Sequence, residues 1–183
     1  TAARARAVGL AALREVYPQI EFAHFMDGDT QLIDGWVDAA CEAMAQSNVA
    51  AVCGRICERH PQSSIYNRLI SLEWDGPIGE SKSCGGTAMF RLSAYDQAGG
   101  YNPQIIAGEE PELCYRLRQA GWKIMRLDQP MVWHDAAMTR WVQWWNRARR
   151  SGHAYAEAMA YHGREPERFG VRPTLSIWAW ALV

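Results

Sequence analysis

The sequence predicts an α/β layer fold. Short apolar segments alternate along the chain with segments of helical spacing, the pattern expected of strands and helices packed in layers. Clusters of Gly, Pro, Asp and Ser separate these segments and mark turns. With 183 residues, 49% of them hydrophobic, the chain is long enough for one domain with a substantial core.

The first half of the chain predicts three helices and two strands. An Ala-, Leu- and Arg-rich segment ends before Pro18, and Asp34 is placed to cap the helix that follows a turn at 27–30. The predicted helices cover residues 2–16, 34–46 and 61–74. The predicted strands cover residues 20–26 and 49–57, the second of which is apolar enough to be buried.

The second half begins with a segment rich in Gly, Ser and Pro at residues 75–86, which we interpret as a functional loop. One helix is marked by Pro111 in its first turn and by Gly121 at its end. A long helix rich in Trp and Arg is predicted over residues 139–162. The predicted strands of this half cover residues 87–91, 123–127 and 132–134.

The two ends of the chain predict a fragment. Its first residues lie inside a helical pattern, without an initiator methionine or a secretory signal, so we expect the chain to start within a longer protein. Residues 174–183 form an apolar run half as long as the roughly 20 residues of a membrane-spanning helix. This run predicts either a truncated membrane segment or a buried helix.

Charge and cysteine content exclude some classes of function. A formal net charge of -1 supplies no general attraction for nucleic acid. The five cysteines, at positions 41, 53, 57, 84 and 114, show neither CxxC nor Cys/His zinc spacing. We therefore expect reduced thiols in a cytosolic compartment, most of them with a packing role.

The segment Phe25-Met26-Asp27-Gly28-Asp29 places two carboxylates directly after an apolar strand. Ligands of α/β proteins bind at this end of the strands, and carboxylate oxygens suit Mg²⁺ or Mn²⁺ bound to a diphosphate. The alternative is an acidic turn that caps the next helix. A phosphatase of the haloacid dehalogenase type is disfavoured, because such enzymes have Thr or Val two places beyond the second aspartate, where this chain has Gln31.

A second acidic cluster lies at 108–113, with the sequence GEEPEL. If Pro111 is the first helical residue, Glu110 lies at the cap, where the helix dipole favours an ionised carboxylate that can accept a proton. The alternative is that these acids only compensate the dipole.

Two further segments can bind a ligand. Gly85 and Gly86, before Thr87, open the backbone for a sugar or phosphate contact, or else form a tight turn into the next strand. The helix that carries Arg147 has an apolar tryptophan stripe and no acid among residues 140–150, which suits a membrane interface, a diphosphate lid or a core-packing helix. His134 either completes a metal shell or is structural.

These segments, in this order, resemble the family 2 glycosyltransferases of the GT-A fold. The DGD segment at 27–29 resembles the DxD motif of that family, and Gly85-Gly86-Thr87 resembles its donor/acceptor loop. The run from Ala98-Gly99-Gly100-Tyr101 to GEEPEL, with Arg116, resembles the ED motif and the stretch before it. The resemblance covers residues 1 to about 135.

The resemblance implies a GT-A type three-layer sandwich with a mixed, mostly parallel sheet, truncated at both ends. It divides the chain into a partial catalytic domain at 1–135 and a Trp/Arg-rich helix with an apolar tail at 136–183, for which a membrane interface is one of the interpretations. The family's opening strand, which carries a nucleotide-recognising Asp, is missing, so we expect weakened donor binding by the fragment. The QxxRW motif of the processive members is also missing.

The implied activity is an inverting transfer of a sugar, of the hexosyltransferase type, from a nucleotide-diphosphate donor to a hydroxyl group. Asp29 and Asp27 are the implied metal ligands, for Mn²⁺ or Mg²⁺, and His134 is the candidate that would complete the metal site. Glu110 is the implied general base and Glu109 its supporting neighbour. The implied donor-binding residues are Asp27, Gly85, Gly86, Thr87 and Arg147.

The partners implied are a nucleotide-diphospho-sugar donor, a saccharide or lipid-linked acceptor and a membrane surface, with no nucleic acid. The full-length protein is expected at the cytoplasmic face of a bacterial inner membrane, in polysaccharide biosynthesis, and the fragment itself is expected to be soluble. Two other functions remain open: a non-catalytic membrane-associated module built on the Trp/Arg helix, and a metal-dependent nucleotidyltransferase. The second would need a basic, Gly-rich triphosphate loop, which the sequence does not offer.

Overall fold

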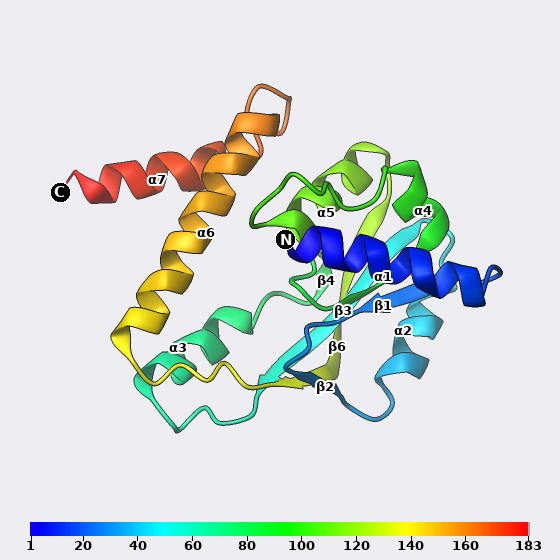
Figure 1. Cartoon of the computed structure of the whole chain (residues 1–183), viewed down its shortest axis with the longest axis horizontal. Helices are drawn as coiled ribbons and strands as arrows, with labels where there is room; N and C mark the ends of the chain where they lie inside the picture. Colours follow the sequence, from blue (N-terminus) through cyan, green and yellow to red (C-terminus); the bar gives the residue numbers. More distant parts are fainter. Residues whose placement is uncertain (183) are drawn as a thin grey trace.

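A mixed six-stranded sheet forms the centre of the computed structural model, which describes residues 1–182 (Figure 1). The strands are β1 (Phe22–Phe25), β2 (Thr30–Leu32), β3 (Val49–Glu58), β4 (Gly79–Glu80), β5 (Ala88–Arg91) and β6 (Lys123–His134). The helices are α1 (Ala2–Val16), α2 (Trp36–Met44), α3 (Ile65–Trp74), α4 (Leu92–Gln97), α5 (Glu109–Gln119), α6 (Trp141–His162) and α7 (Val171–Ala181).

The strand order is β1-β5-β3-β6-β2, and β4 pairs with another part of β6. Among residues 1–182, β3 and β6 form the parallel pair, whereas every other pair is antiparallel. The predicted mixed sheet is therefore confirmed, but the expectation of mostly parallel pairing is wrong. Part of the reason is that β2 and β4 are three and two residues long, too short to recognise in the sequence. Both strands pair antiparallel with β6.

Helices cover both faces of the sheet, as a three-layer sandwich requires. Successive strand residues point to opposite faces. On β1, the ring of His24 lies 6.1 Å from that of Trp36 in α2, whereas the ring of Phe25 lies 5.8 Å from that of Tyr95 in α4. Helix α5 lies on the same face of the sheet as α4. Cys53 of β3 is close to Cys84, and the Sγ of Cys84 is 4.0 Å from the Sγ of Cys114 in α5.

An aromatic cluster supports the end of β1. Phe25 packs against Phe90, Tyr95 and Tyr101, with ring centroids 5.3 to 5.8 Å apart. All four side chains are buried in the core. Since Asp27 follows β1 by two residues, this packing fixes the position from which the acidic turn starts.

Most predicted elements are confirmed, although two predicted helix caps are wrong. Helix α2 begins after Gly35 (φ 80°), so Asp34 is not its cap. Helix α5 begins after Gly108 (φ 81°), which places Glu110 inside the first turn instead of at the cap. Glycine adopts this left-handed backbone without the Cβ penalty, and here it sets where each helix starts. The predicted strands at 123–127 and 132–134 are one strand, β6.

Helices α6 and α7 extend away from the sheet (Figure 1). Side-chain contacts join α6 to the rest of the fold: Arg147 Nη1 lies 2.7 Å from Glu73 Oε2 of α3, and Glu157 Oε2 accepts from the Ile106 amide at 3.2 Å. Helix α7 packs across α6 near Gly152, and Thr174 is its buried residue. Among residues 1–182, no helix has both the length and the apolarity needed to cross a membrane.

Candidate active site

Arg6 brings the two acidic clusters together. Its Nη2 donates to Asp27 Oδ1 at 2.7 Å and to the carbonyl oxygen of Gly86 at 3.0 Å, while its Nη1 donates to Glu109 Oε1. One guanidinium therefore links the turn after β1, the start of α5 and the loop before β5. Burial disfavours the charged guanidinium, yet Tyr101, Asp27 and Glu109 together raise its pKa above the ordinary value.

Arg6 was not among the predicted site residues. The missed signal is helical spacing: Arg6 lies three residues after Ala3 and four before Leu10, and both of these are buried. Residues at this spacing share a helix face, so Arg6 lies on the inner face of α1. A charged residue on such a face needs a carboxylate partner, and the chain supplies two.

Gly86 lies directly against Asp27. A Cβ added to Gly86 would come within 2.7 Å of Asp27 Oδ2, so a larger residue would displace the carboxylate. Gly85 has φ 82°, and it turns the loop toward α5. Thr87, in contrast, is buried, so its side chain does not face a donor in this structure.

Asp29 lies beside His134. Its Oδ2 is 3.2 Å from His134 Nε2, and the pairing of β2 with β6 explains the contact, since Thr30 lies opposite His134 in the register. The His134 ring also stacks on Trp74 at 4.6 Å with an interplanar angle of 10°. The Asp29 side chain is 62% exposed and that of His134 18%, so a ligand can reach this pair from one side.

The three expected metal ligands do not meet at one point. In the described part of the chain, the one group of three potential ligands with mutual distances within 4.8 Å is Cys84, Glu110 and Cys114. Asp27 instead pairs with Arg6, while Asp29 and His134 form a separate pair. A carboxylate is a preferred ligand of Mg²⁺ and Mn²⁺, and an imidazole nitrogen is a common metal ligand. The donor atoms of the Asp29–His134 pair therefore suit a divalent cation, and Asp27, whose Oδ1 is paired with Arg6, lies two residues earlier in the same turn.

Glu110 is buried beneath the loop before β5. Its Oε1 accepts from the Cys84 amide at 2.6 Å and from Cys114 Sγ at 2.8 Å, and its Oε2 accepts from the Gly85 amide at 2.9 Å. Burial raises the pKa of Glu110 to about 7, the three hydrogen bonds oppose that rise, and Glu109 adds to it. The helix dipole was expected to keep Glu110 ionised, but burial favours its protonated form instead.

Arg147 lies at the edge of this region. It pairs with Glu73, the neighbour in sequence of Trp74, whose ring stacks on His134. In this structure Arg147 contacts neither Asp27 nor Asp29 and fastens α6 to α3 instead.

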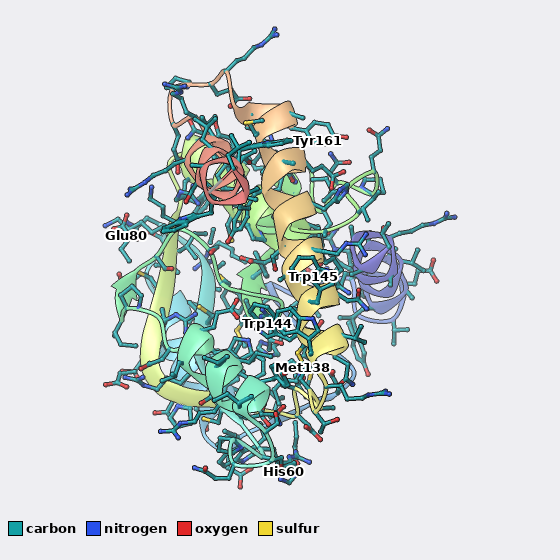
Figure 2. The ribbon with its side chains drawn as sticks, turned by 90° about the vertical axis from the view of Figure 1, so that its left-hand side faces the viewer. His60, Glu80, Met138, Trp144, Trp145 and Tyr161 are labelled. Carbon is teal, nitrogen blue, oxygen red and sulfur yellow. The ribbon has the colours of Figure 1, made fainter. Side chains whose placement is uncertain are left out.

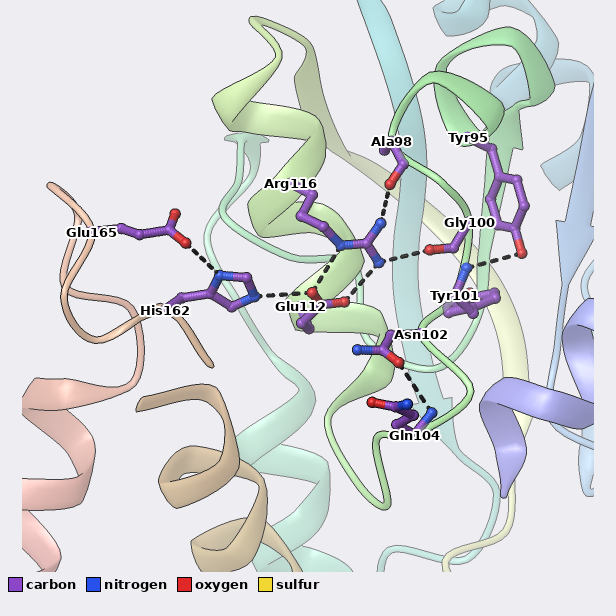
Figure 3. A network of polar contacts seen from close by, with 10 residues as sticks. All are labelled: Tyr95, Ala98, Gly100, Tyr101, Asn102, Gln104, Glu112, Arg116, His162 and Glu165. Atoms are coloured by element: carbon purple, nitrogen blue, oxygen red, sulfur yellow. Dashed lines mark hydrogen bonds and ion pairs between the residues drawn. The ribbon is translucent and has the colours of Figure 1, made fainter. Parts of the chain in front are cut away.

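A buried polar network fixes α5 relative to its neighbours (Figure 3). Both Glu112 oxygens accept from Arg116, at 2.8 and 2.7 Å, and Arg116 donates to the carbonyl oxygen of Gly100 at 2.6 Å. His162 of α6 lies between Glu112 and Glu165, 3.0 Å from each. This network holds the helix that carries Glu109 and Glu110 against both the loop at 98–101 and α6.

The chain is similar to known glycosyltransferases in sequence and in fold. No protein-family model matches the chain. The pre-mycofactocin glycosyltransferases of Mycobacterium tuberculosis strains CDC 1551 / Oshkosh and ATCC 25618 / H37Rv are each 26% identical over 144 residues, which is 73% of this chain. The chain spans 30% of the length of these relatives.

Among solved structures, the mannosyltransferase PcManGT from Pyrobaculum calidifontis, in complex with GDP-Man and Mn²⁺, matches 93% of this chain and 48% of its own. The TM-score is 0.58 and the sequence identity 16%. The chain has the GT-A fold. The three-layer arrangement and the mixed sheet agree with this assignment, and the sequence relatives are glycosyltransferases as well.

Proposed function

We propose that this chain is the catalytic part of a family 2 glycosyltransferase that moves a sugar from a nucleoside-diphosphate donor to a hydroxyl group, with inversion. The observation that carries the proposal is the double contact of Arg6. It holds Asp27, in the DGD turn, and Glu109, in the GEEPEL segment, at one corner of the sheet. The likeness to glycosyltransferases in sequence, and to a GDP-Man-bound mannosyltransferase in fold, supports the same reaction class.

In this proposal Asp29 and His134, with Asp27, would hold Mn²⁺ or Mg²⁺, which would supply positive charge beside the diphosphate leaving group. Gly85 and Gly86 let the backbone approach the donor closely, because neither carries a side chain. Arg6 keeps the free oxygen of Asp27 turned toward Gly86 and so orients the carboxylate.

Glu110 is the proposed general base. The acceptor oxygen attacks the anomeric carbon and its proton passes to the Glu110 carboxylate, while the bond from the anomeric carbon to the diphosphate oxygen breaks. A carboxyl group whose pKa is about 7 accepts a proton readily near neutral pH. In this structure the amides of Cys84 and Gly85 cover both carboxylate oxygens, so the proposal requires this loop to move when the acceptor binds.

Glu109 has the supporting role in this scheme. Its carboxylate is paired with Arg6, and its contribution is to keep Arg6 and hence Asp27 in position. The proposed acceptor is a saccharide or a lipid-linked sugar, and the proposed site of action is the cytoplasmic face of a bacterial inner membrane, in polysaccharide synthesis. Residues 1–135 would form the catalytic part, and residues 136–183 would lie against the membrane.

The test compares Glu110→Gln with Glu109→Gln, using GDP-mannose and Mn²⁺ as the first donor and metal. We expect Glu110→Gln to abolish sugar transfer while donor binding, measured by calorimetry, is retained. Glu109→Gln should weaken transfer and keep a pH dependence set by Glu110, shifted toward lower pH because Glu109 adds to the raised pKa of Glu110. Transfer at the wild-type rate in Glu110→Gln would remove Glu110 as the base, and loss of donor binding in the same variant would reassign it to the binding site.

A further inference from the structure

Three cysteines and a glutamate meet beneath the loop before β5. The cysteines are Cys53 in β3, Cys84 in this loop and Cys114 in α5, and all three are buried. The Sγ atoms of Cys84 and Cys114 are 4.0 Å apart, and Glu110 Oε1 is 2.8 Å from Cys114 Sγ. Cys53 lies close to both of the other thiols. We call these four residues the thiol–Glu110 cluster; because they come from segments far apart in the sequence, their spacing shows no metal motif.

The separations within the cluster suit a tetrahedral zinc ion. With Zn–S distances of about 2.3 Å and a Zn–O distance of about 2.1 Å, the ligand atoms lie roughly 3.6 to 3.8 Å apart. The sulfurs of Cys84 and Cys114 are close to this separation already. Glu110 and Cys114 are at hydrogen-bond distance, so their two atoms would move apart by about 0.8 Å as the shared proton leaves. Thiolates favour Zn²⁺ over Mg²⁺ or Mn²⁺, which bind oxygen ligands.

Backbone amides already hold the carboxylate of the cluster in place. A carboxylate that binds a metal is normally fixed by further hydrogen bonds. Glu110 Oε2 accepts from the Gly85 amide at 2.9 Å, and Oε1 accepts from the Cys84 amide at 2.6 Å. These bonds keep Oε1 on the side of the sulfurs, so the ligand oxygen needs little rearrangement.

The loop before β5 offers a path to the cluster. Ser83 and Gly85, on either side of Cys84, are partly exposed, so one layer of backbone separates the cluster from solvent. Helix α6 closes another side, because a Cβ added to Gly108, directly before α5, would lie 2.9 Å from Ala154 Cβ of α6. Figure 2 views the molecule from the side on which α6 lies. A cation would therefore enter by movement of the loop.

We propose that the thiol–Glu110 cluster is a zinc-binding site, separate from the Asp29–His134 pair. The three thiolates and the carboxylate fill the four positions of a tetrahedron, and each thiol proton passes to solvent when the sulfur binds. Burial raises the pKa of Cys84 and Cys114, so both are neutral thiols until the cation displaces their protons. The chain thus has sulfur ligands at one site, and oxygen and imidazole ligands at the other.

Zinc at this site would inhibit the proposed reaction. This consequence rests on the proposed function, in which the loop opens and Glu110 accepts the proton of the acceptor. Zinc would occupy Glu110 Oε1 and would tie Cys84 of the loop to Cys114 of α5. The loop would then stay closed over the proposed base.

The first test is zinc binding by the reduced 183-residue chain after treatment with a chelator. The first equivalent of Zn²⁺ should bind in competition with a chromogenic chelator, and excess Mn²⁺ should not displace it. X-ray absorption of this complex should show sulfur neighbours at about 2.3 Å from zinc. No binding, or a zinc shell of nitrogen and oxygen alone, would overturn the proposal.

Variants then locate the ion. Cys84→Ser and Cys114→Ser should each weaken zinc binding at least about a hundredfold, because loss of even an outer partner of a metal ligand costs about 10- to 100-fold. Glu110→Gln keeps all three thiols and should weaken binding at least about tenfold. The matched control, Cys41→Ser, changes an exposed cysteine outside the cluster and should bind as wild type. Wild-type affinity in any folded variant of the cluster would overturn the proposal; if a serine variant does not fold, the sulfur shell and Glu110→Gln decide the question.

The loop gives a readout that needs no enzyme activity. Zn²⁺ should slow hydrogen exchange of the Cys84 and Gly85 amides at least about tenfold, and Mn²⁺ should not. Unchanged exchange with zinc bound would overturn the inhibitory role. Zinc binding through sulfur in a chain that transfers no sugar would support the site and count against the proposed function alone.

Discussion

Replacing Glu110 by Gln should change how the stability of the protein depends on pH. Glu110 is buried, and its pKa is about 7 in the folded protein against an ordinary value of 4.5. Between these two pH values the folded protein holds a proton at Glu110 that the unfolded chain has released. The free energy of unfolding therefore falls as the pH rises through this window, and its full contribution is present below about pH 4.5.

The size of the effect follows from the difference between about 7 and 4.5. At about 1.4 kcal/mol per pKa unit, the wild type loses about 3 kcal/mol of stability across the window. Gln does not titrate, so this loss disappears in Glu110→Gln. The Gln side chain has one carbonyl oxygen where Glu110 has two carboxylate oxygens, so one of the backbone N–H groups of Cys84 and Gly85 loses its acceptor. This loss adds a penalty of about 1 to 3 kcal/mol that does not depend on pH.

The assay is urea unfolding of wild type and Glu110→Gln at several pH values between about 4.5 and 8. We expect a flatter stability curve for the variant, whatever its absolute stability. Glu109→Gln is the matched control, because it removes the adjacent carboxylate and leaves Glu110 to titrate. Parallel curves for wild type and Glu110→Gln would refute the reasoning, since they would show that Glu110 has the same pKa in the folded and unfolded states.

Two further predictions concern residues that hold the site together. Arg6→Met should cost about 3 kcal/mol in urea unfolding, because the largely buried Glu109 loses its cation; unchanged stability would show that the Arg6 contacts are not formed in solution. Gly108→Ala should lower the free energy of unfolding by about 1 to 2 kcal/mol more than Gly121→Ala does. Both glycines have positive φ, but a Cβ at Gly108 would lie 2.9 Å from Ala154 Cβ, whereas Gly121 has open space; equal costs would contradict the packing of α6 against α5.

The sequence predicted the long elements well because their spacing is regular. The helix at 2–16 has its bounds as predicted, and the apolar run at 49–57 is β3. The sequence could not show β2 and β4, since strands of three and two residues have no measurable periodicity. The two strands predicted at 123–127 and 132–134 are one strand, β6, and Pro130 between them lies where the register with β3 shifts.

The site could be predicted only in part. Asp27, Asp29 and Glu110 were singled out from local motifs, but the partner of each carboxylate depends on contacts distant in sequence. Asp29 meets His134 because β2 pairs with β6, and Asp27 meets Arg6 because α1 turns its inner face toward the turn. The burial of Glu110 depends on the start of α5 after Gly108, which places its side chain on the inner face.

The structure of the apolar run at residues 174–183 also depends on contacts that the sequence does not show. Its composition was consistent with a membrane segment or a buried helix, and the structure shows an exposed α7. The predicted packing role of the cysteines agrees with the burial of Cys53, Cys84 and Cys114, although the position of the last two beside Glu110 could not be read from their spacing. Long-range packing therefore decides which predicted residues share a site.

The most direct test of the account is whether a divalent cation binds at the Asp29–His134 pair. Mn²⁺ added to the labelled chain with a nucleoside diphosphate, GDP or UDP, should broaden the NMR signals of the His134 imidazole and of the 27–29 amides first. Asp29→Asn should remove this effect, while Asp34→Asn, a change at an exposed aspartate outside the site, should preserve it. Signals that broaden equally in Asp29→Asn, or that broaden elsewhere and not at His134, would contradict the proposed catalytic centre.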